Sequence, residues 1–263
     1  MKLPLTVAII QARMASSRLP GKVLLDIAGK AMLQWVVERT RLAKSLDAIV
    51  VATSTDPADD PIAEFCAAHG YACTRGSLHD VLDRYYHAAV LHGAYLVVRL
   101  TADCPLLDPG LIDQTVRQIW GAHSVHTITA VPWYDFTANR LPPPWGRMYP
   151  IGLDVEVATF NALETAWREA TAPHQREHVM PFIYENADRF KISVIHHDHD
   201  YGSLRWTVDT SEDLAALRAL VPLLPRAFTW LDVLRTWQAH PEIAALNAAV
   251  PHKTVTDIDT RAS

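Results

Sequence analysis

The segment LTVAIIQARMASSRLPGK, residues 5–22, decides the fold. Residues 5–10 are apolar without polar alternation, which is typical of a strand buried on both faces of a sheet. Residues 11–22 hold three cations, two serines and several small residues. Because open α/β sheets bind ligands at the carboxyl ends of their strands, this loop predicts a site for an anion such as a polyphosphate. A solvated basic loop is the competing interpretation, since the loop matches neither GxxxxGK[ST] nor GxGxxG.

Apolar strands and amphipathic helices alternate through the first half of the chain. Further strands are predicted at 47–53, 71–74 and 95–100. Helices are predicted at 31–43, 61–69, 79–92 and 109–120. Strands without polar alternation that are separated by helices indicate a mainly parallel sheet with helices on both faces.

A proline-rich stretch at residues 132–150 interrupts this pattern. Proline lacks a backbone N–H, so we predict that the stretch forms neither helix nor central strand. We expect an excursion over the surface, which is either a plain long loop or a lid or dimer contact. Trp133 and Trp145 are the candidates for such a contact.

The remainder of the chain returns to strands and helices. Strands are predicted at 151–158 and 190–196, with a short one that ends at 207–209. Helices are predicted at 159–170, 176–186, 229–239 and 241–248, and one begins after Thr210, where Asp213 completes a capping box. No repeat or linker divides the sequence. We therefore expect one domain over residues 1–250 and a flexible tail at 251–263.

Composition excludes several classes of protein. The chain has 263 residues, a net charge of −5, 49% hydrophobic residues and 3 cysteines. It is too apolar for global disorder and too acidic for general attraction to nucleic acid or anionic lipid. Three cysteines do not make a disulfide-stapled secreted domain. No apolar run approaches the ~18 residues of a membrane span, so we expect a cytoplasmic protein.

Seven blocks of sequence resemble one known family. The blocks are IIQARMASSRLPGKVLLDIAGKAML, ATSTDPADDPI, RGSLHDVLDRYYHAA, VVRLTADCPLLDP, YPIGLDVEV, REHVMPFI and LRWTVDTSEDL, and they occur in the family's order. The sequence is similar to the cytidylyltransferase-like family of spore coat polysaccharide biosynthesis proteins. These proteins are relatives of the acylneuraminate and 3-deoxy-manno-octulosonate cytidylyltransferases. The resemblance covers most of residues 5–220.

The resemblance implies a fold and a reaction. The fold is α/β: a single-domain nucleotide-diphospho-sugar transferase (GT-A-like) fold with a mixed, mostly parallel sheet between helices. The reaction is the Mg²⁺-dependent transfer of CMP from CTP to an acidic sugar or related acceptor, with release of pyrophosphate. The product would serve the synthesis of surface polysaccharide or glycoconjugate. Related enzymes are often dimers, so a homodimer is expected.

By resemblance, Arg13, Lys22, Asp103 and Asp209 are catalytic, and the two aspartates hold Mg²⁺. The implied nucleotide-binding residues are Gln11, Ala12, Arg13, Ser16, Ser17, Arg18, Lys22, Arg75, Ser77, Asp80 and Arg84. The residue types agree with these roles, since cations suit a triphosphate and paired carboxylates suit Mg²⁺.

Local structure offers alternatives for several of these residues. Asp103 is a turn former before proline, and Asp209 neighbours a helix cap. Asp80 and Arg84 have the spacing of a surface i,i+4 pair, and Ser77 has that of a helix cap.

The expected acceptor-binding residues lie later in the chain. They are Asn139, Asp154, Glu156, Arg176, Glu177 and His178. Alternation along a strand puts Asp154 and Glu156 on one face. That face would meet acceptor hydroxyls or amines, or a second metal, or, alternatively, solvent at a sheet edge. A charged first helical turn is the alternative for residues 176–178. We predict that the His/Asp run at 196–200 is a solvated loop rather than a metal site.

Two substitutions depart from the family pattern. Ala15 and Ala102 stand where glycine is usual, and we expect both to be tolerated. The proline-rich insert is longer than usual, which leaves the acceptor open. Two further functions are considered: a glycosyltransferase that uses a nucleotide-sugar, and a non-catalytic nucleotide-binding subunit.

Overall fold

One seven-stranded sheet organises the protein. The computed structural model describes residues 5–121 and 131–251. The sheet has the order β11-β7-β10-β6-β1-β4-β5. Its strands are β1 (Leu5–Gln11), β4 (Ala48–Ser54), β5 (Cys73–Gly76), β6 (Ala94–Thr101), β7 (Phe136–Ala138), β10 (Glu156–Thr159) and β11 (Ile192–Val194). Only β10 runs antiparallel to its neighbours in this sheet, which confirms the mixed, mostly parallel arrangement.

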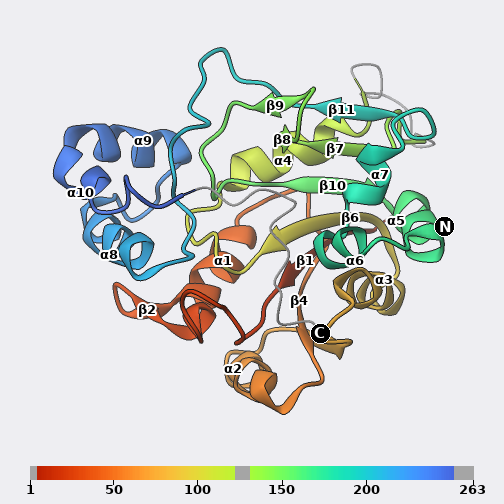
Figure 1. Ribbon diagram of the computed structural model, residues 1–263, viewed down its shortest axis with the longest axis horizontal. Helices are drawn as coiled ribbons and strands as arrows, with labels where there is room; N and C mark the ends of the chain where they lie inside the picture. The colour runs from red at the N-terminus through yellow and green to blue at the C-terminus, as the bar shows by residue number, and fades with distance from the viewer. Residues whose placement is uncertain (1–4, 122–130, 252–263) are drawn as a thin grey trace.

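Helices cover both faces of the sheet (Figure 1). On one face lie α1 (Met32–Thr40), α2 (Asp60–Ala68) and α4 (Pro109–Gln118). On the other lie α3 (Val81–Leu91), α5 (Phe160–Glu169) and α7 (Pro181–Glu185), and α6 (Pro173–His178) contacts α3 and α7.

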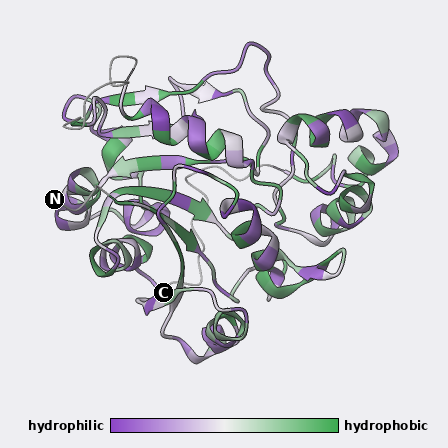
Figure 2. Ribbon diagram, turned by 180° about the vertical axis from the view of Figure 1, so that it is seen from behind, coloured by the Kyte–Doolittle hydropathy of each residue, from purple (hydrophilic) through white to green (hydrophobic). Residues whose placement is uncertain are grey.

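The central strand β1 is apolar because it serves both layers. Val7 and Ile9 belong to the core under α3 and α5, whereas Ala8 and Ile10 belong to the core under α1 and α4. All four are fully buried, and each isoleucine stabilises the fold by about 2 kcal/mol. Figure 2 shows the strands largely in the colours of hydrophobic residues.

A third hydrophobic cluster lies beyond one end of the sheet, at the left of Figure 1. It joins α8 (Ser211–Leu220), α9 (Trp230–Ala239) and α10 (Pro241–Ala245) around the buried Trp206. Thr210 and Asp213 form the expected capping box of α8. The remaining short elements are η1 (Lys22–Leu24), β2 (Asp26–Ile27), β3 (Lys30–Ala31), η2 (Pro57–Asp59), β8 (Arg140–Leu141), β9 (Gly146–Arg147) and η3 (Val221–Leu223).

The prediction that the proline-rich stretch holds no central strand is wrong. β7 lies inside this stretch and pairs with β10 on one side and β11 on the other. The reason is the spacing of the prolines: residues 133–141 contain none, so their backbone N–H groups can join a ladder. Pro142, Pro143 and Pro144 instead occupy the turn between β8 and β9.

Several other predicted elements change their bounds. The predicted helix at 176–186 is two helices, α6 and α7, because Val179 adopts φ 73° between them. The predicted strand at 151–158 shortens to β10. Residues 207–209 form no strand, although Val208 N donates to Asp103 O at 2.9 Å. Apart from Pro251, the predicted tail lies outside the described residues.

Candidate active site

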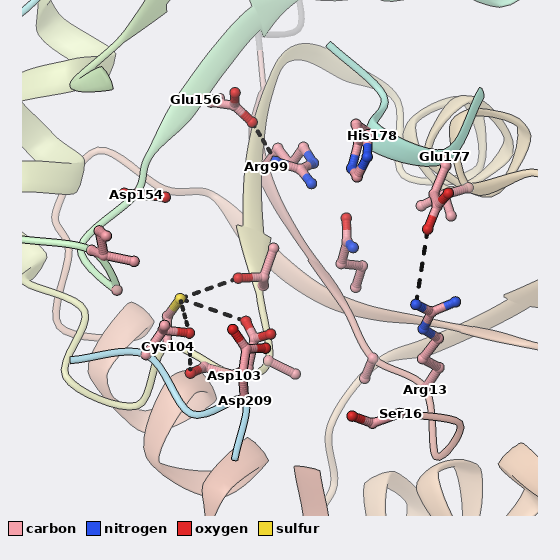
Figure 3. A pocket seen from close by; sticks show the side chains of 18 of the residues that line it. Arg13, Ser16, Arg99, Asp103, Cys104, Asp154, Glu156, Glu177, His178 and Asp209 are labelled. Atoms are coloured by element: carbon pink, nitrogen blue, oxygen red, sulfur yellow. Dashed lines mark hydrogen bonds and ion pairs between the residues drawn. The ribbon is translucent and has the colours of Figure 1, made fainter. Parts of the chain in front are cut away.

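A cavity of about 650 Å³ opens at the carboxyl ends of β1 and β6. It is lined by the loop after β1, the β8–β9 hairpin, α6 and the segment before α8. Figure 3 shows the labelled side chains converging on this space. Most of the residues expected from sequence line it, namely Gln11, Ala12, Arg13, Ser16, Ser17, Arg18, Lys22, Arg84, Asp103, Asp154, Glu156, Glu177, His178 and Asp209.

The loop after β1 is held in a compact turn. Gly21 has φ +71°, a left-handed conformation that glycine adopts without strain, and its N–H donates to Met14 O at 2.8 Å. The buried Asp59 accepts a hydrogen bond from Met14 N at 2.6 Å. These contacts place the basic side chains of the loop along one wall of the cavity.

Lys22 joins the two aspartates that were expected to hold a metal. Its Nζ lies 2.7 Å from Asp103 Oδ2 and 2.9 Å from Asp209 Oδ1, and it donates to Val208 O at 2.8 Å. Burial lowers the pKa of Lys22, but Asp103 and Asp209 outweigh burial and the pKa is raised. The ammonium therefore stays charged between two carboxylates.

Two arginines complete the surroundings of Asp209. Arg18 Nη2 and Arg205 Nη2 each lie 2.8 Å from Asp209 Oδ2. Burial raises the pKa of Asp209, but the cations Lys22, Arg205 and Arg18 outweigh it, so the pKa falls well below its usual value. Asp209 is an anion at every pH at which the protein would work.

The carboxylates of Asp103 and Asp209 suit a divalent cation. Both reach one ammonium, so their oxygens already converge on a positive charge, and oxygen is the ligand that Mg²⁺ prefers. In the described part of the chain, the hydrogen-bonding contact of Asp103 Oδ1 is a weak one from the Cys104 thiol, at 3.6 Å. Within residues 5–121 and 131–251, no group of three or more His, Cys, Asp or Glu side chains could hold a metal.

Three arginines gather at the other end of the cavity. Arg99 pairs with Glu156, whereas Arg147 and Arg140 both contact Asp154, with Arg147 Nη2 at 2.9 Å and Arg140 Nε at 3.3 Å. Burial raises the pKa of Asp154, but Arg147 and Arg140 outweigh it and lower the pKa to about 2. Glu156 is the first residue of β10, an inner strand, and Asp154 lies two residues before that strand; both line the cavity, so Glu156 is not at a solvent-exposed sheet edge.

The end of α6 presents two side chains to the cavity. Glu177 Oε1 lies 3.9 Å from Arg13 Nη2, as the dashed line in Figure 3 shows. His178 lies beside Arg99 in the same view. Burial, followed by the charges of Arg99 and Arg140, lowers the pKa of His178 to about 4, so its ring is neutral at pH 7.

Buried polar atoms without a hydrogen-bond partner collect in this cavity. Among the described residues, six such atoms belong to lining residues. Two of them, Arg18 Nη2 and Arg140 Nε, lie within ion-pair distance of a carboxylate, and the other four are Gln11 Oε1, Arg84 Nε, Arg99 Nε and His178 Nε2. A buried polar atom without a partner costs free energy unless something binds it. These atoms indicate that the cavity accommodates a polar ligand.

Five predicted site residues do not line the cavity. Arg75 donates to Ser54 O and pairs with Asp60, and the Ser77 hydroxyl accepts from Asp80 N. Asp80 pairs with Arg176 and caps α3, so the alternative Asp80–Arg84 pair does not form.

Asn139 also has a structural task. Its side-chain amide makes two hydrogen bonds to the backbone of the segment before β10: it donates to Leu153 O at 2.7 Å and accepts from Val155 N at 2.9 Å. It holds the segment before β10 in place and does not face the cavity.

Sequence reasoning missed the arginines at 99, 140, 147 and 205. Arg99 carries the clearest signal, because a lone arginine inside the apolar strand β6 needs a buried partner. No such signal marks Arg140 and Arg147, which the β8–β9 hairpin brings together. Asp198 and Asp200, which formally match a DxD motif, are exposed and do not line the cavity.

Comparisons with known proteins identify the family of the chain. The family model described as cytidylyltransferase matches residues 7–229. The spore coat polysaccharide biosynthesis protein SpsF of Bacillus subtilis is 31% identical over 81% of this chain and 84% of its own. A 3-deoxy-manno-octulosonate cytidylyltransferase of Geobacter sulfurreducens is 42% identical over 43% of this chain and 44% of its own. A cytidylyltransferase structure from Leptospira borgpetersenii has a TM-score of 0.84 and 30% identity over 95% of this chain and all of that one. The chain belongs to the cytidylyltransferase family, and it is a nucleotidyltransferase.

Proposed function

We propose that the protein transfers CMP from CTP to an acidic sugar or related acceptor, with Mg²⁺ and with release of pyrophosphate. One observation carries the proposal. A single cavity holds a basic loop, a pair of carboxylates and a group of arginines. A triphosphate, a divalent cation and an anionic acceptor need these three environments.

The basic loop supplies the charge that the triphosphate requires. Arg13, Arg18 and Lys22 project from it toward the cavity. Transfer of a nucleotidyl group depends on positioning and on stabilising charge at the departing pyrophosphate more than on covalent chemistry by the protein. Arg13 and Lys22 are the residues that we assign to that charge.

Asp103 and Asp209 are the residues that would hold Mg²⁺. The bound ion would neutralise phosphate charge and polarise the α-phosphate toward attack. Lys22, Arg18 and Arg205 keep Asp209 ionised without the ion, so the site is ready to receive it. The ligands that two carboxylates cannot supply would come from phosphate oxygens and water.

The arginine-rich end is assigned to the acceptor. Asp154 and Glu156 are each neutralised by guanidinium groups, and within the described part of the chain the buried Arg99 Nε still lacks a partner. This end therefore offers an unused donor and a net positive charge, which favour a carboxylate or phosphate on the acceptor. The similarity to a 3-deoxy-manno-octulosonate cytidylyltransferase supports a sugar acid as the acceptor, and the similarity to a spore coat polysaccharide biosynthesis protein supports a sugar.

The test supplies the protein with each of the four NTPs, Mg²⁺ and a panel of acidic sugars, and measures pyrophosphate. We expect release with CTP and at least one sugar acid, and none with Asp103→Asn, whose melting temperature should match the wild type within a few degrees. Consumption of a nucleotide-sugar without pyrophosphate release would favour a glycosyltransferase. CTP binding without any product would favour a non-catalytic subunit.

Other proposed properties are tested separately. A homodimer is proposed from the resemblance, and sedimentation at micromolar concentration checks it. Among the described residues no helix is long and apolar enough to cross a membrane.

A further inference from the structure

Asp213 has more partners than a helix cap requires. As the third residue of α8 it needs only to accept from the backbone N–H of Thr210, at 3.1 Å. It also accepts from Asp209 N at 2.9 Å and from Arg205 Nε at 2.8 Å, and it is completely buried. A buried carboxylate with this many donors has a task beyond ending a helix.

The capping box of α9 provides an internal comparison. There Thr229 and Asp232 make the same reciprocal contacts, with Asp232 Oδ2 accepting from Thr229 N at 2.8 Å. Among the residues that the structure describes, the ion-pair partner of Asp232 is the exposed Arg235 of its own helix. The capping motif is thus complete without a buried arginine, and the additional partners at Asp213 serve another purpose.

Arg205 connects Asp213 to the cavity. It is buried, lines the cavity and holds Asp213 with two nitrogens, at 2.8 and 2.9 Å. Its Nη2 also donates to Asp209 Oδ2 at 2.8 Å. Asp213 therefore fixes both the backbone N–H of Asp209 and the guanidinium that orients the Asp209 carboxylate.

Asn247 secures this arrangement from a distant part of the chain. It lies after α10, beyond residue 229 where the family model ends, and it is buried. Its Nδ2 donates to Asp213 Oδ1 at 3.0 Å and to Arg205 O at 3.2 Å. Both neighbours are acceptors, so only the NH₂ side of the amide can face them.

We propose that Asn247 is a positioning residue, which acts through Asp213 and Arg205 to fix the Asp209 carboxylate for the divalent cation and nucleotide. The proposal rests on the proposed function, in which Asp209 binds the cation. It makes the C-terminal helical cluster part of the active site. Residues that hold metal ligands in place typically change metal affinity or activity by about 10- to 100-fold when they are replaced.

The experiment measures Mn²⁺ binding by electron paramagnetic resonance on the full chain with α,β-methylene CTP, whose α–β bridge resists cleavage. At a temperature well below the melting temperature of the variant, Asn247→Ala should bind Mn²⁺ about tenfold more weakly than the wild type. Asp213→Asn, which keeps the side-chain volume, should weaken binding at least as much. If Asn247→Ala folds poorly, Asp213→Asn takes its place as the test variant.

Val233→Ala is the matched control. Val233 is fully buried in the same helical cluster, and its apolar side chain can make no hydrogen bond to Asp213 or Arg205, so the variant should lose stability while the polar contacts of Asp209 remain. Its Mn²⁺ affinity should equal that of the wild type. Equal affinity for Asn247→Ala and Val233→Ala would overturn the proposal while leaving the proposed function intact. A wild-type protein that binds no Mn²⁺ with the analogue would contradict both.

Discussion

Lys22 Nζ lies 2.7 Å from Asp103 Oδ2, although 81 positions separate the two residues in the sequence. The same ammonium is 2.9 Å from Asp209, 187 positions away. One lysine thus gathers the ends of two distant segments around the basic loop. The active site depends on this contact for its assembly as well as for its charge.

Replacing Lys22 should affect both stability and activity. Lys22→Met removes the ammonium that Asp103 and Asp209 share, although Arg18 and Arg205 still pair with Asp209, so we expect a loss of about 2 kcal/mol in the free energy of unfolding. Activity should fall on the order of 10²-fold or more. Urea titration and initial rates check the two effects. The surface pair Lys30–Glu38 is the control: Lys30→Met should cost less than ~1 kcal/mol and leave the rate unchanged.

Replacing an arginine at the proposed acceptor end should affect binding of the acceptor but not binding of CTP. Arg140→Ala removes a donor at the proposed acceptor end, so the KM for the acceptor should rise about tenfold or more while the KM for CTP stays the same. Arg75→Ala provides the contrast, since Arg75 contacts Ser54 and Asp60 away from the cavity. Both KM values should be normal in that variant. A rise in the KM for CTP in Arg140→Ala would move this residue to the nucleotide.

His178 should make stability depend on pH. Its folded pKa of about 4 lies below the unfolded value of 6.5, so the unfolded chain binds the additional proton between these pH values. Stability therefore rises as pH increases from 4 to 6.5 and is unaffected by this group above that range. In His178→Gln, the melting temperature should depend less on pH over this interval than in the wild type. An unchanged slope would show that His178 is not buried in its neutral form.

Gly152 should be intolerant of a side chain. Its φ is +105°, and a Cβ there would lie 2.6 Å from Thr207 N and from Trp206 C, within the segment that leads to Asp209. Gly152→Ala should lower the free energy of unfolding by more than about 2 kcal/mol. It should also reduce the rate, because the backbone of Trp206 and Thr207 must move to make room for the methyl group. Gly29→Ala is the control, since φ is +85° there but nothing lies within 4 Å. If both variants lose equal stability, the close approach is unimportant.

The sequence predicted the parts of this structure that depend on neighbours along the chain. The apolar run of β1, the capping box at Thr210 and the basic loop all follow local patterns, and all are present. β7 was missed because counting prolines over 132–150 hid a proline-free segment between them.

The partners of charged side chains were harder to predict. Asp80 has Arg84 one turn away but pairs with Arg176, 96 positions distant. Asp154 pairs with Arg140 and Arg147 of the β8–β9 hairpin, and its own segment of sequence does not indicate either partner. Such pairs form where folding brings segments together, which spacing along one element cannot reveal.

The central claim is that CMP moves from CTP to a sugar acid in this cavity. CTP labelled at its α-phosphorus, incubated with Mg²⁺, 3-deoxy-manno-octulosonate and the other acids of the panel, tests it most directly. We expect the label to enter a new nucleotide-sugar in an amount equal to the pyrophosphate released, and Asp209→Asn to abolish the labelled product and the pyrophosphate. Label recovered only as CTP or free CMP with every acceptor would contradict CMP transfer to a sugar acid.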